Sequence, residues 1–307
     1  MLRRFVAAIL AAALLCFAAF WVLTKPQTLS ADALAAHTPD LGNGRTLFYA
    51  GDCASCHATP TQKDMTRLGG GRALKTKFGI FYPPNISSDR ADGIGAWSEA
   101  EFITAMTKGI GPGGRQLYPV FPYTSFQRIT DSDLADLFAF IKTLPAVKGR
   151  APADEVSFPF SFRRFIGLWK LLYLDGEPFQ PDPDRSDIWN RGAYLANGAG
   201  HCAECHSPRN FLGGVVKGER FAGGPNPVDK GWVPNITQQH LAKWLVKDIA
   251  YLLDTGMTLN GDSVGSSMSE VVKNLSHLSN DDRMAIATYI KSLPPVAGPT
   301  PPKKKKQ

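Results

Sequence analysis

One short cysteine–histidine pattern occurs twice in this chain, and its repetition constrains the fold more than any other feature. The pattern reads CASCH at 53–57 and CAECH at 202–206, so the two copies lie 149 positions apart. Other segments recur at almost the same spacing: PPNIS at 83–87 with VPNIT at 233–237, and DLFAFIKTLP at 136–145 with MAIATYIKSLP at 284–294. Similarity at a fixed spacing indicates repeated structural units. The sequence therefore predicts two similar units, at residues 36–148 and 185–296.

Each unit is predicted to be mostly helical. The stretch ITDSDLADLFAFIKTLP has Asp131 or Ser132 to cap its start, apolar residues at intervals of three and four, and Pro145 as a stop. The matching stretch LSNDDRMAIATYIKSLP has the same plan. A short helical stretch with a glycine, Gly44 or Gly192, precedes each cysteine pair. Because no long alternating strand pattern is present, the predicted fold class is all-α.

Residues 1–26 contain an uninterrupted apolar run of 19 residues, Phe5–Leu23. A run of this length can span a bilayer and exceeds the apolar core of a signal peptide. Two arginines precede it, which predicts that this end stays in the cytoplasm and that everything after Lys25 lies on the outer side. A cleaved signal peptide is the alternative, because ADA at 31–33 is a possible processing site, although it lies far downstream. We therefore favour a membrane anchor.

The net charge of +7 is concentrated at the two ends of the chain. Of the 34 basic residues, seven are Arg3, Arg4, Lys25 and the four lysines of 303–306, so 27 remain to balance 27 acidic residues. A neutral body gives no indication of nucleic-acid binding. The Pro- and Lys-rich end, 297–307, is predicted to be disordered.

The pattern C-x-x-C-H indicates a specific covalent chemistry. Two thiols three positions apart can each add to a vinyl group of haem, and the adjacent histidine can then ligate the iron. The residues concerned are Cys53, Cys56 and His57 in the first copy and Cys202, Cys205 and His206 in the second. Zinc binding is the alternative, but a histidine follows both pairs, each pair has its own large repeat, and free dithiols tend to oxidise outside the cytoplasm. We therefore predict two covalently bound c-type haems.

Both repeats resemble class I cytochrome c domains: a glycine-bearing helix, CxxCH, a middle helix, a methionine loop and a final helix ending in LP. Beyond the anchor, the whole chain resembles the membrane-bound di- and tri-haem cytochrome c subunits of periplasmic dehydrogenases that oxidise alcohols, sugar acids or N-heteroaromatics. The segments PPNIS…GIGAWSEAEF and GDSVGSSMSEVVKN are more specific to this group than CxxCH. The resemblance implies two tandem class I cytochrome c domains after an N-terminal transmembrane helix.

In that family a methionine thioether usually supplies the sixth ligand of the iron, which raises the reduction potential. In the second repeat the matching residue is Met268, in GSSMSEVV, with Met257 as the alternative. A core methionine that only fills space is the other interpretation of Met268.

The first repeat has no methionine at the matching position. That position falls at Pro119–Phe121 within LYPVFPYTSF, where Phe121 stands in the expected place. We expect Phe121 and Tyr118 to form a rigid apolar lid on the distal side of haem 1. Weaker candidates for a distal ligand are Met106 in a helix, Met65 in a polar loop and His37 upstream. Haem 1 is thus expected to be five-coordinate or to use an unexpected ligand, with a lower potential than haem 2.

The resemblance implies an electron-transfer subunit rather than an enzyme. It would cross the inner membrane once, with its haem domains in the periplasm, and pass electrons from a periplasmic dehydrogenase to quinone, a soluble cytochrome or a terminal oxidase. A di-haem peroxidase with an open position on haem 1 is the alternative, and a gas sensor is less favoured because no signalling domain is evident. No substrate pocket with a base or nucleophile is recognisable.

The segment between the repeats, 149–184, includes the apolar stretch SFPFSFRRFIGLWKLLYL with Arg163, Arg164 and Lys170 interspersed. A helix that joins the two domains is the favoured interpretation, because long apolar patches are rarely exposed. The alternative is a docking surface for a partner subunit or the bilayer.

Overall fold

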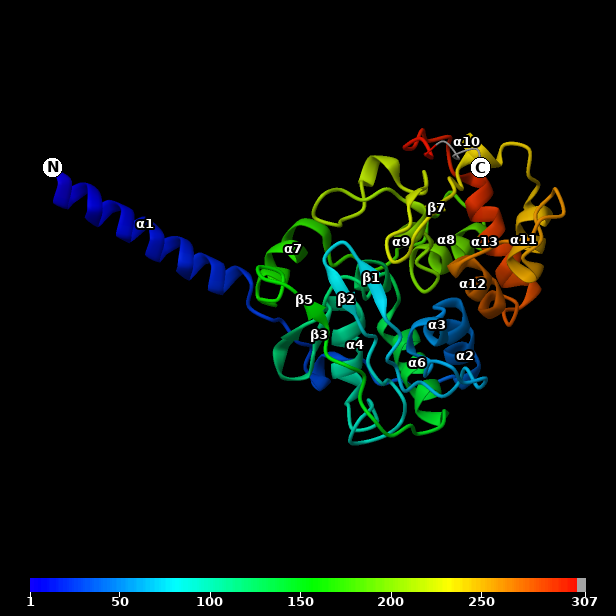
Figure 1. The fold of residues 1–307 in the computed structure, drawn as a ribbon. Coiled ribbons are helices and arrows are strands. Elements are labelled where there is room, and N and C mark those ends of the chain that lie inside the picture. Colours follow the sequence, from blue (N-terminus) through cyan, green and yellow to red (C-terminus); the bar gives the residue numbers. More distant parts are fainter. Residues whose placement is uncertain (303–307) are drawn as a thin grey trace.

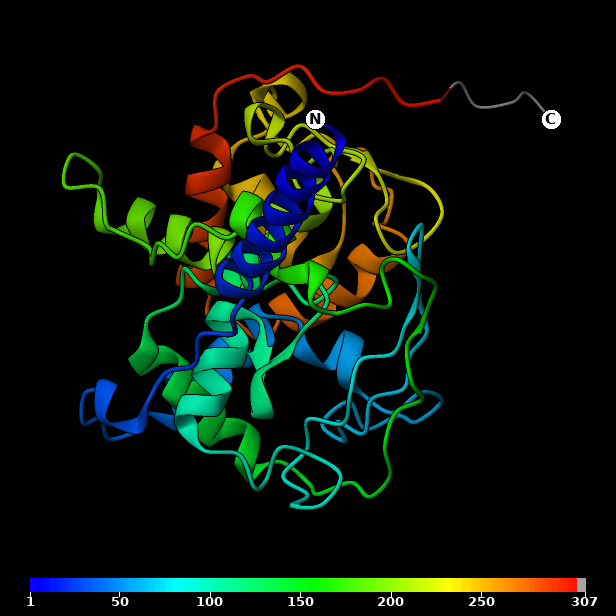
Figure 2. The same cartoon turned by 90° about the vertical axis from the view of Figure 1, so that its left-hand side faces the viewer.

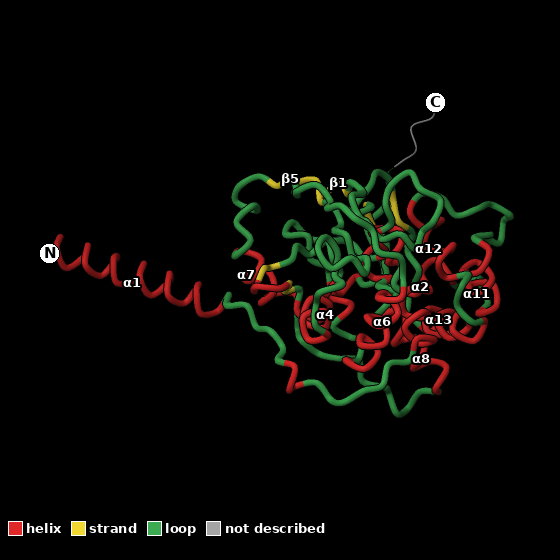
Figure 3. Tube along the Cα trace, turned by 90° about the horizontal axis from the view of Figure 1, so that it is seen from below, coloured by secondary structure: helices red, strands yellow, loops and turns green. Residues whose placement is uncertain are grey.

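The computed structural model describes residues 1–302, so the lysines of the predicted disordered tail lie outside the described residues. The chain is mostly helical, with three small sheets. Figure 1 shows one long helix projecting from a folded body, and in Figure 3 the same helix is a straight rod outside the body. Helices from residues 36–148 (the first half) occupy the lower part of Figure 1, and those from 185–296 (the second half) the upper right.

The projecting helix is α1 (Leu2–Leu23), which contains the predicted anchor. None of its residues is buried, and its mean hydropathy reaches 2.7. Its 22 residues span about 33 Å, slightly more than the hydrocarbon core of a bilayer, about 30 Å. By length and composition α1 could cross a membrane, and a signal sequence near the N-terminus would meet the same test.

The same helix pair forms in both halves and explains the two glycines of the sequence. The first half contains α2 (Leu41–Ala50), α3 (Cys53–His57), α4 (Glu99–Lys108), α5 (Tyr123–Phe126) and α6 (Asp131–Thr143). The second contains α8 (Asp187–Asn197), α9 (Cys202–His206), α10 (Gln238–Leu241), α11 (Val246–Thr255), α12 (Ser267–Leu275) and α13 (Asn280–Ser292). A Cβ on Gly44 would lie 2.1 Å from the Asp136 carbonyl oxygen in the α2–α6 pair, and one on Gly192 would lie 1.9 Å from that of Ala285 in the α8–α13 pair. Glycine is therefore required where these backbones touch.

The start of α6 differs from the sequence prediction by one residue. The cap is Thr130, whose hydroxyl accepts a hydrogen bond from the Asp133 backbone N–H at 3.2 Å. Asp131 instead lies in the first turn, where its charge favours the positive end of the helix dipole. Threonine can serve as an N-cap much as aspartate does, so the sequence alone left the boundary open.

The sheets are too short to have been recognised from an alternating pattern. They are antiparallel and consist of β1 (Leu74–Thr76), β2 (Gly79–Phe81) and β5 (Glu155–Val156); β3 (Ile110–Gly111) and β4 (Arg115–Gln116); and β6 (Gly224–Pro225) and β7 (Trp232–Val233). Single-turn 3-10 helices lie at η1 (Ala31–Ala33), η2 (Pro112–Gly114) and η3 (Lys217–Glu219). Strand β5 lies in the segment between the halves and ties it to the first half through β2.

A single apolar core runs through both halves. One cluster of buried side chains includes Leu47 and Ile103 of the first half and Leu195 and Ile286 of the second. The segment 149–184 contributes one helix, α7 (Phe165–Tyr173), at the end of the body next to α1. The two halves are therefore packed against each other directly.

Equivalent asparagines fasten the chain after the last helix of each half. The side-chain amide of Asn85 donates to the Val147 carbonyl oxygen at 2.6 Å, and that of Asn235 donates to the Val296 carbonyl oxygen at 2.8 Å. Beyond α13 the described chain is extended, as the red trace in Figure 2 shows. Gly298, at the start of the predicted tail, packs closely on the Ala222 backbone.

Candidate functional site

Both CxxCH motifs form short helices, α3 and α9, that begin after a residue with left-handed backbone. These residues are Asp52, with φ 50°, and His201, with φ 36°. Aspartate tolerates this conformation better than most residues, and histidine is also enriched there. The sharp turn starts each helix at its first cysteine, so the two thiols lie one turn apart, and all four are unpaired and half-buried.

The histidine of each motif is held in the same way. His57 Nδ1 lies 2.8 Å from the Pro84 carbonyl oxygen, and His206 Nδ1 lies 2.8 Å from that of Pro234. A carbonyl only accepts, so Nδ1 must donate its hydrogen, and the lone pair stays on Nε2. Burial lowers the pKa of both imidazoles, which keeps them neutral and able to bind a metal through Nε2.

These groups fit a covalently attached haem. Each site combines two unpaired thiols with one neutral, oriented imidazole, which are the residues needed for two thioether bonds and one axial iron ligand. Within residues 1–302 no group of three or more His, Cys, Asp or Glu side chains is arranged to hold a metal ion by itself. The donor set therefore favours haem over the zinc alternative.

At the boundary between the halves, each motif helix is bonded to another helix of the opposite half, so one type of contact is made twice. The side-chain amide of Asn274, on α12, donates to Asp52 Oδ1 at 2.6 Å and lies 3.4 Å from the hydroxyl of Ser55, on α3. The hydroxyl of Ser125, on α5, donates to Glu204 Oε1, on α9, at 2.9 Å. Ser55 and Glu204 are equivalent positions at the repeat spacing, and so are Ser125 and Asn274. The halves are thus related by an approximate two-fold exchange of contacts.

Aromatic contacts reinforce this boundary. His201 places Nε2 3.3 Å from the Gly51 carbonyl oxygen and its ring edge-on to Phe126, with ring centres 5.6 Å apart. Tyr49 stacks on His277, with ring centres 4.1 Å apart. Figure 1 shows α12 beside α2 and α3, consistent with these contacts.

Glu204 is a buried carboxylate inside the second motif, and its charge is compensated locally. Burial alone would raise its pKa, but Arg209 and hydrogen bonds from Thr124 and Ser125 hold the pKa below its ordinary value. The Arg209 guanidinium lies 2.6 Å from Glu204 Oε2, and the Thr124 hydroxyl donates to Oε1 at 2.8 Å. The carboxylate therefore stays charged beside Cys202 and Cys205.

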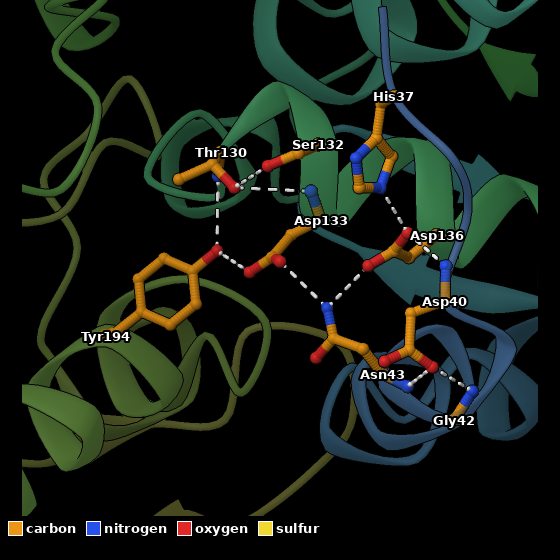
Figure 4. A network of polar contacts seen from close by, with 9 residues as sticks. All are labelled: His37, Asp40, Gly42, Asn43, Thr130, Ser132, Asp133, Asp136 and Tyr194. Carbon is orange, nitrogen blue, oxygen red and sulfur yellow. Dashed lines mark hydrogen bonds and ion pairs between the residues drawn. The ribbon is translucent and has the colours of Figure 1, made fainter.

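A polar network, drawn in Figure 4, joins the halves on another side and engages His37. Tyr194 of α8 donates to Asp133 and accepts from the Thr130 backbone N–H, and Asn43 bridges Asp133 and Asp136 with two bonds of 2.8 Å. His37 Nε2 lies 2.6 Å from Asp136 Oδ1. This pairing fixes His37 at the α2–α6 crossing, so the structure gives no support to His37 as an iron ligand.

The methionine candidates occupy different surroundings. Met268 lies in the first turn of α12, half-buried and packed against the core, whereas the sulfur of Met257 accepts from the Ser263 hydroxyl at 3.7 Å. Met106 is buried in α4, and Met65 lines a cavity of about 90 Å³ between the first motif and α12. Both second-half methionines are half-buried, and Met268 is the one that packs against the apolar core.

The two residues of the predicted lid point in different directions. Phe121 packs inward against Phe126, with ring centres 5.4 Å apart. Tyr118 instead faces the segment between the halves: its hydroxyl donates to the Phe160 carbonyl oxygen at 3.1 Å, and the Arg163 guanidinium lies 4.1 Å from its ring centre. The distal role of Phe121 stays a prediction, whereas Tyr118 fastens the connecting segment.

Sequence reasoning gave no role to Lys170, which is buried next to this loop. Its Nζ donates to the Gly109 carbonyl oxygen at 2.7 Å and to Gln116 Oε1 at 2.6 Å, and lies 4.9 Å from the ring centre of Tyr123. Burial lowers the pKa of Lys170 to about 7. A lysine in an otherwise apolar stretch was the available signal, but nothing in the sequence indicated its partners.

Comparisons with known proteins agree with this site. The cytochrome c family model matches residues 41–145. A diheme cytochrome c-type protein of Cereibacter sphaeroides is 42% identical over 96% of this chain and 100% of its own length. The chain belongs to the cytochrome c family. The match to the family model covers the first motif, and the full-length relative covers both.

Other relatives of this cytochrome c are parts of dehydrogenases. The fructose dehydrogenase cytochrome subunit of Gluconobacter japonicus is 36% identical over 88% of this chain, and the gluconate 2-dehydrogenase cytochrome c subunit of Pantoea cypripedii is 32% identical over 87%. The matched regions make up only 56% and 63% of those two proteins. The similarity supports covalently bound haem and is consistent with electron transfer.

Proposed function

We propose that this cytochrome c is a membrane-anchored relay that carries electrons from a periplasmic dehydrogenase to the respiratory chain through two c-type haems. Helix α1 anchors it in the inner membrane as a single span. Residues 36–148 and 185–296 form two tandem class I cytochrome c domains on the periplasmic side. The relatives that are named as cytochrome subunits of dehydrogenases support the choice of electron donor.

Each half holds its own haem in this proposal. Cys53 and Cys56 attach the first haem and Cys202 and Cys205 the second, while His57 and His206 supply the axial imidazoles. Met268 supplies the sixth ligand of the second haem. When bound, the haem iron supplies the one-electron chemistry; the protein holds, buries and spaces the two groups.

The reciprocal contact between the halves is the main support for a relay. It places α3 and α9, which carry the four cysteines, on either side of one boundary. Four of the residues that join them, Ser55, Ser125, Glu204 and Asn274, are buried, so these contacts lie inside the packed protein. An electron that moves from one site to the other therefore passes through packed protein.

The two haems are proposed to differ on their distal sides. The position that matches Met268 falls at Pro119–Phe121, where no methionine is present, and Phe121 has no group that can bind iron. Without a soft sulfur ligand to favour Fe(II), the first haem has the lower reduction potential of the two. Electrons therefore run downhill from the first site to the second.

Haem content tests the two-haem proposal directly. We expect two haems per wild-type chain by the pyridine haemochrome assay, and one in each double variant, Cys53→Ala with Cys56→Ala or Cys202→Ala with Cys205→Ala. A redox titration of the full-length protein should then show two separate potentials, each lost in one double variant. One haem per wild-type chain would refute the proposal, and rapid turnover of hydrogen peroxide by the reduced protein would favour a peroxidase instead.

A further inference from the structure

The segment 158–172 presents an apolar surface to solvent. Its exposed large side chains are Phe158, Phe160, Phe162, Phe165, Leu168, Leu171 and Leu172. On α7 the exposed positions follow helical spacing, whereas the opposite, buried face carries Ile166, Gly167 and Lys170. A helix on the surface of a soluble domain has the reverse pattern, with its charges outward. Exposed apolar surface of this extent marks a site of interaction.

This segment is fixed to the outer end of α1. Arg164 donates to the Trp21 carbonyl oxygen at 2.6 Å and to the Thr24 hydroxyl at 2.7 Å, and its guanidinium lies 4.5 Å from the ring centre of Trp21. The rings of Phe20 and Phe165 meet edge to face, with centres 5.7 Å apart. Figures 1 and 3 both place α7 at the end of the body from which α1 projects.

The length of α1 fixes the depth of this contact. A helix of 22 residues is only slightly longer than the hydrocarbon core of a bilayer, about 30 Å. The last turn of α1 therefore lies at the boundary between lipid tails and head groups, and whatever is fixed to that turn lies there too. Aromatic side chains such as Trp21 are enriched at this level.

We infer that the segment 158–172 lies in the outer interface of the same bilayer that α1 crosses, with lipid covering its apolar face. This inference rests on the proposed anchoring by α1. Two exposed cations suit anionic head groups at that level: Lys25, directly after α1, and Arg115, which follows a glycine that lies close to Pro26. Two attachments at one place hold the haem-bearing body at a fixed tilt, which a single helix on a loose connection could not do.

A protein partner is the alternative cover for this surface. The dehydrogenase of the proposed function would need to enter the membrane interface to reach it, because the apolar face is continuous with α1. Lipid is already present at that position and suits an apolar face with a basic margin. The geometry therefore favours the bilayer.

Photolabelling of the full-length, haem-loaded protein tests the inference. The protein is reconstituted into vesicles of phosphatidylcholine and phosphatidylglycerol that contain a lipid with a diazirine near the carbonyl end of its acyl chain. After illumination, labelled peptides are identified by mass spectrometry. Peptides from α1 and from 158–172 should both be labelled, whereas the peptide with Phe211, which is as exposed as Phe158 at 81%, should not.

The results separate the inference from the anchor on which it rests. Labelled α1 with 158–172 no more labelled than the Phe211 peptide would overturn the inference alone. Unlabelled α1 would overturn both. If the segment stayed unlabelled in lipid and an added dehydrogenase protected it from an aqueous reagent, a protein partner would replace the bilayer.

A variant and its matched control give a second measurement. The triple variant Phe158→Ser, Leu168→Ser and Leu172→Ser should reduce labelling of the segment severalfold and leave labelling of α1 unchanged. Phe211→Ser, an equally exposed aromatic on the second half, should change neither. Equal labelling of the segment in the triple variant and the wild type would contradict a lipid contact through these side chains.

Discussion

Replacing Gly192 with alanine tests the helix pair that supports the second haem site. The glycine lies on α8, directly before the motif helix α9, and its backbone touches α13. An alanine Cβ would lie 1.9 Å from the Ala285 carbonyl oxygen, and side-chain carbons essentially never approach an atom closer than 3.0 Å. The opposing atom is main chain inside a helix, so it cannot rotate away. The two helices must instead separate by about 1 Å locally.

The expected loss of stability comes from two opposing effects. Alanine in a helix interior is favoured over glycine by about 0.5–1 kcal/mol, whereas overpacking of a close contact costs about 1–3 kcal/mol and occasionally more. Because the added Cβ clashes with a backbone atom, the upper end of that range applies. The free energy of unfolding is therefore expected to fall by about 2 kcal/mol. In a protein of this size such a loss lowers Tm by roughly 3 °C.

Thermal unfolding of the haem-loaded protein, followed by circular dichroism and by the Soret band, measures this effect. Gly44→Ala, in the equivalent helix pair, should cause a similar loss. Gly218→Ala is the control, because its added Cβ would meet nothing within 4 Å; it should leave Tm unchanged or slightly raised. If Gly192→Ala were as stable as the Gly218→Ala control, the close contact between α8 and α13 would be refuted.

Met268→Ala should abolish the Met–Fe absorption band near the red end of the ferric spectrum while Met257→Ala leaves it intact; the opposite result would exchange their roles. Phe121→Met should raise the potential of the first haem in a redox titration, and an unchanged potential would argue that Phe121 does not face that haem. The pKa of Lys170 is 10.5 in the unfolded chain and about 7 in the folded protein. Between these two pH values the unfolded chain binds more protons than the folded protein. The free energy of unfolding therefore rises with pH across this window, by at most about 5 kcal/mol. In the Lys170→Met variant, the free energy of unfolding from urea titrations should no longer rise between these pH values. If it rose with pH as steeply as in the wild type, the assignment to Lys170 would be wrong. Glu204→Ala removes the buried carboxylate that pairs with the half-buried Arg209 guanidinium. It should cost about 3 kcal/mol in urea unfolding, whereas a loss of less than about 1 kcal/mol would mean that the pair is solvated.

The repeat and the motif helices were predictable because each depends on residues close together in the sequence. The CxxCH spacing fits a single helical turn, and the apolar periodicity of the last helix in each half fits helices α6 and α13. The glycines before each motif were recognised as recurring, but the reason for them was not, because Asp136 and Ala285 contribute only their backbone oxygens. Nothing in a side chain can reveal such a contact.

The boundary between the halves was beyond sequence reasoning for a different reason. Asn274 and Asp52 are 222 positions apart, and neither belongs to a pattern that a periodicity would detect. The hydrogen bond from Tyr118 to Phe160 was also not predicted, since Phe160 lies in a connecting segment whose path the sequence does not fix. Pairings over such separations depend on the packed fold.

The exchange of contacts, in which α12 bonds to the first motif and α5 bonds to the second, has a consequence for the ancestry of the chain. Two copies of a single-haem cytochrome that paired symmetrically would make one contact twice, with identical residues. Here the two versions of that contact have diverged: an amide meets a carboxylate and a hydroxyl at one, and a hydroxyl meets a carboxylate at the other. Fusion of such a pair into one polypeptide would produce this arrangement, because after fusion a substitution in one half is no longer repeated in the other.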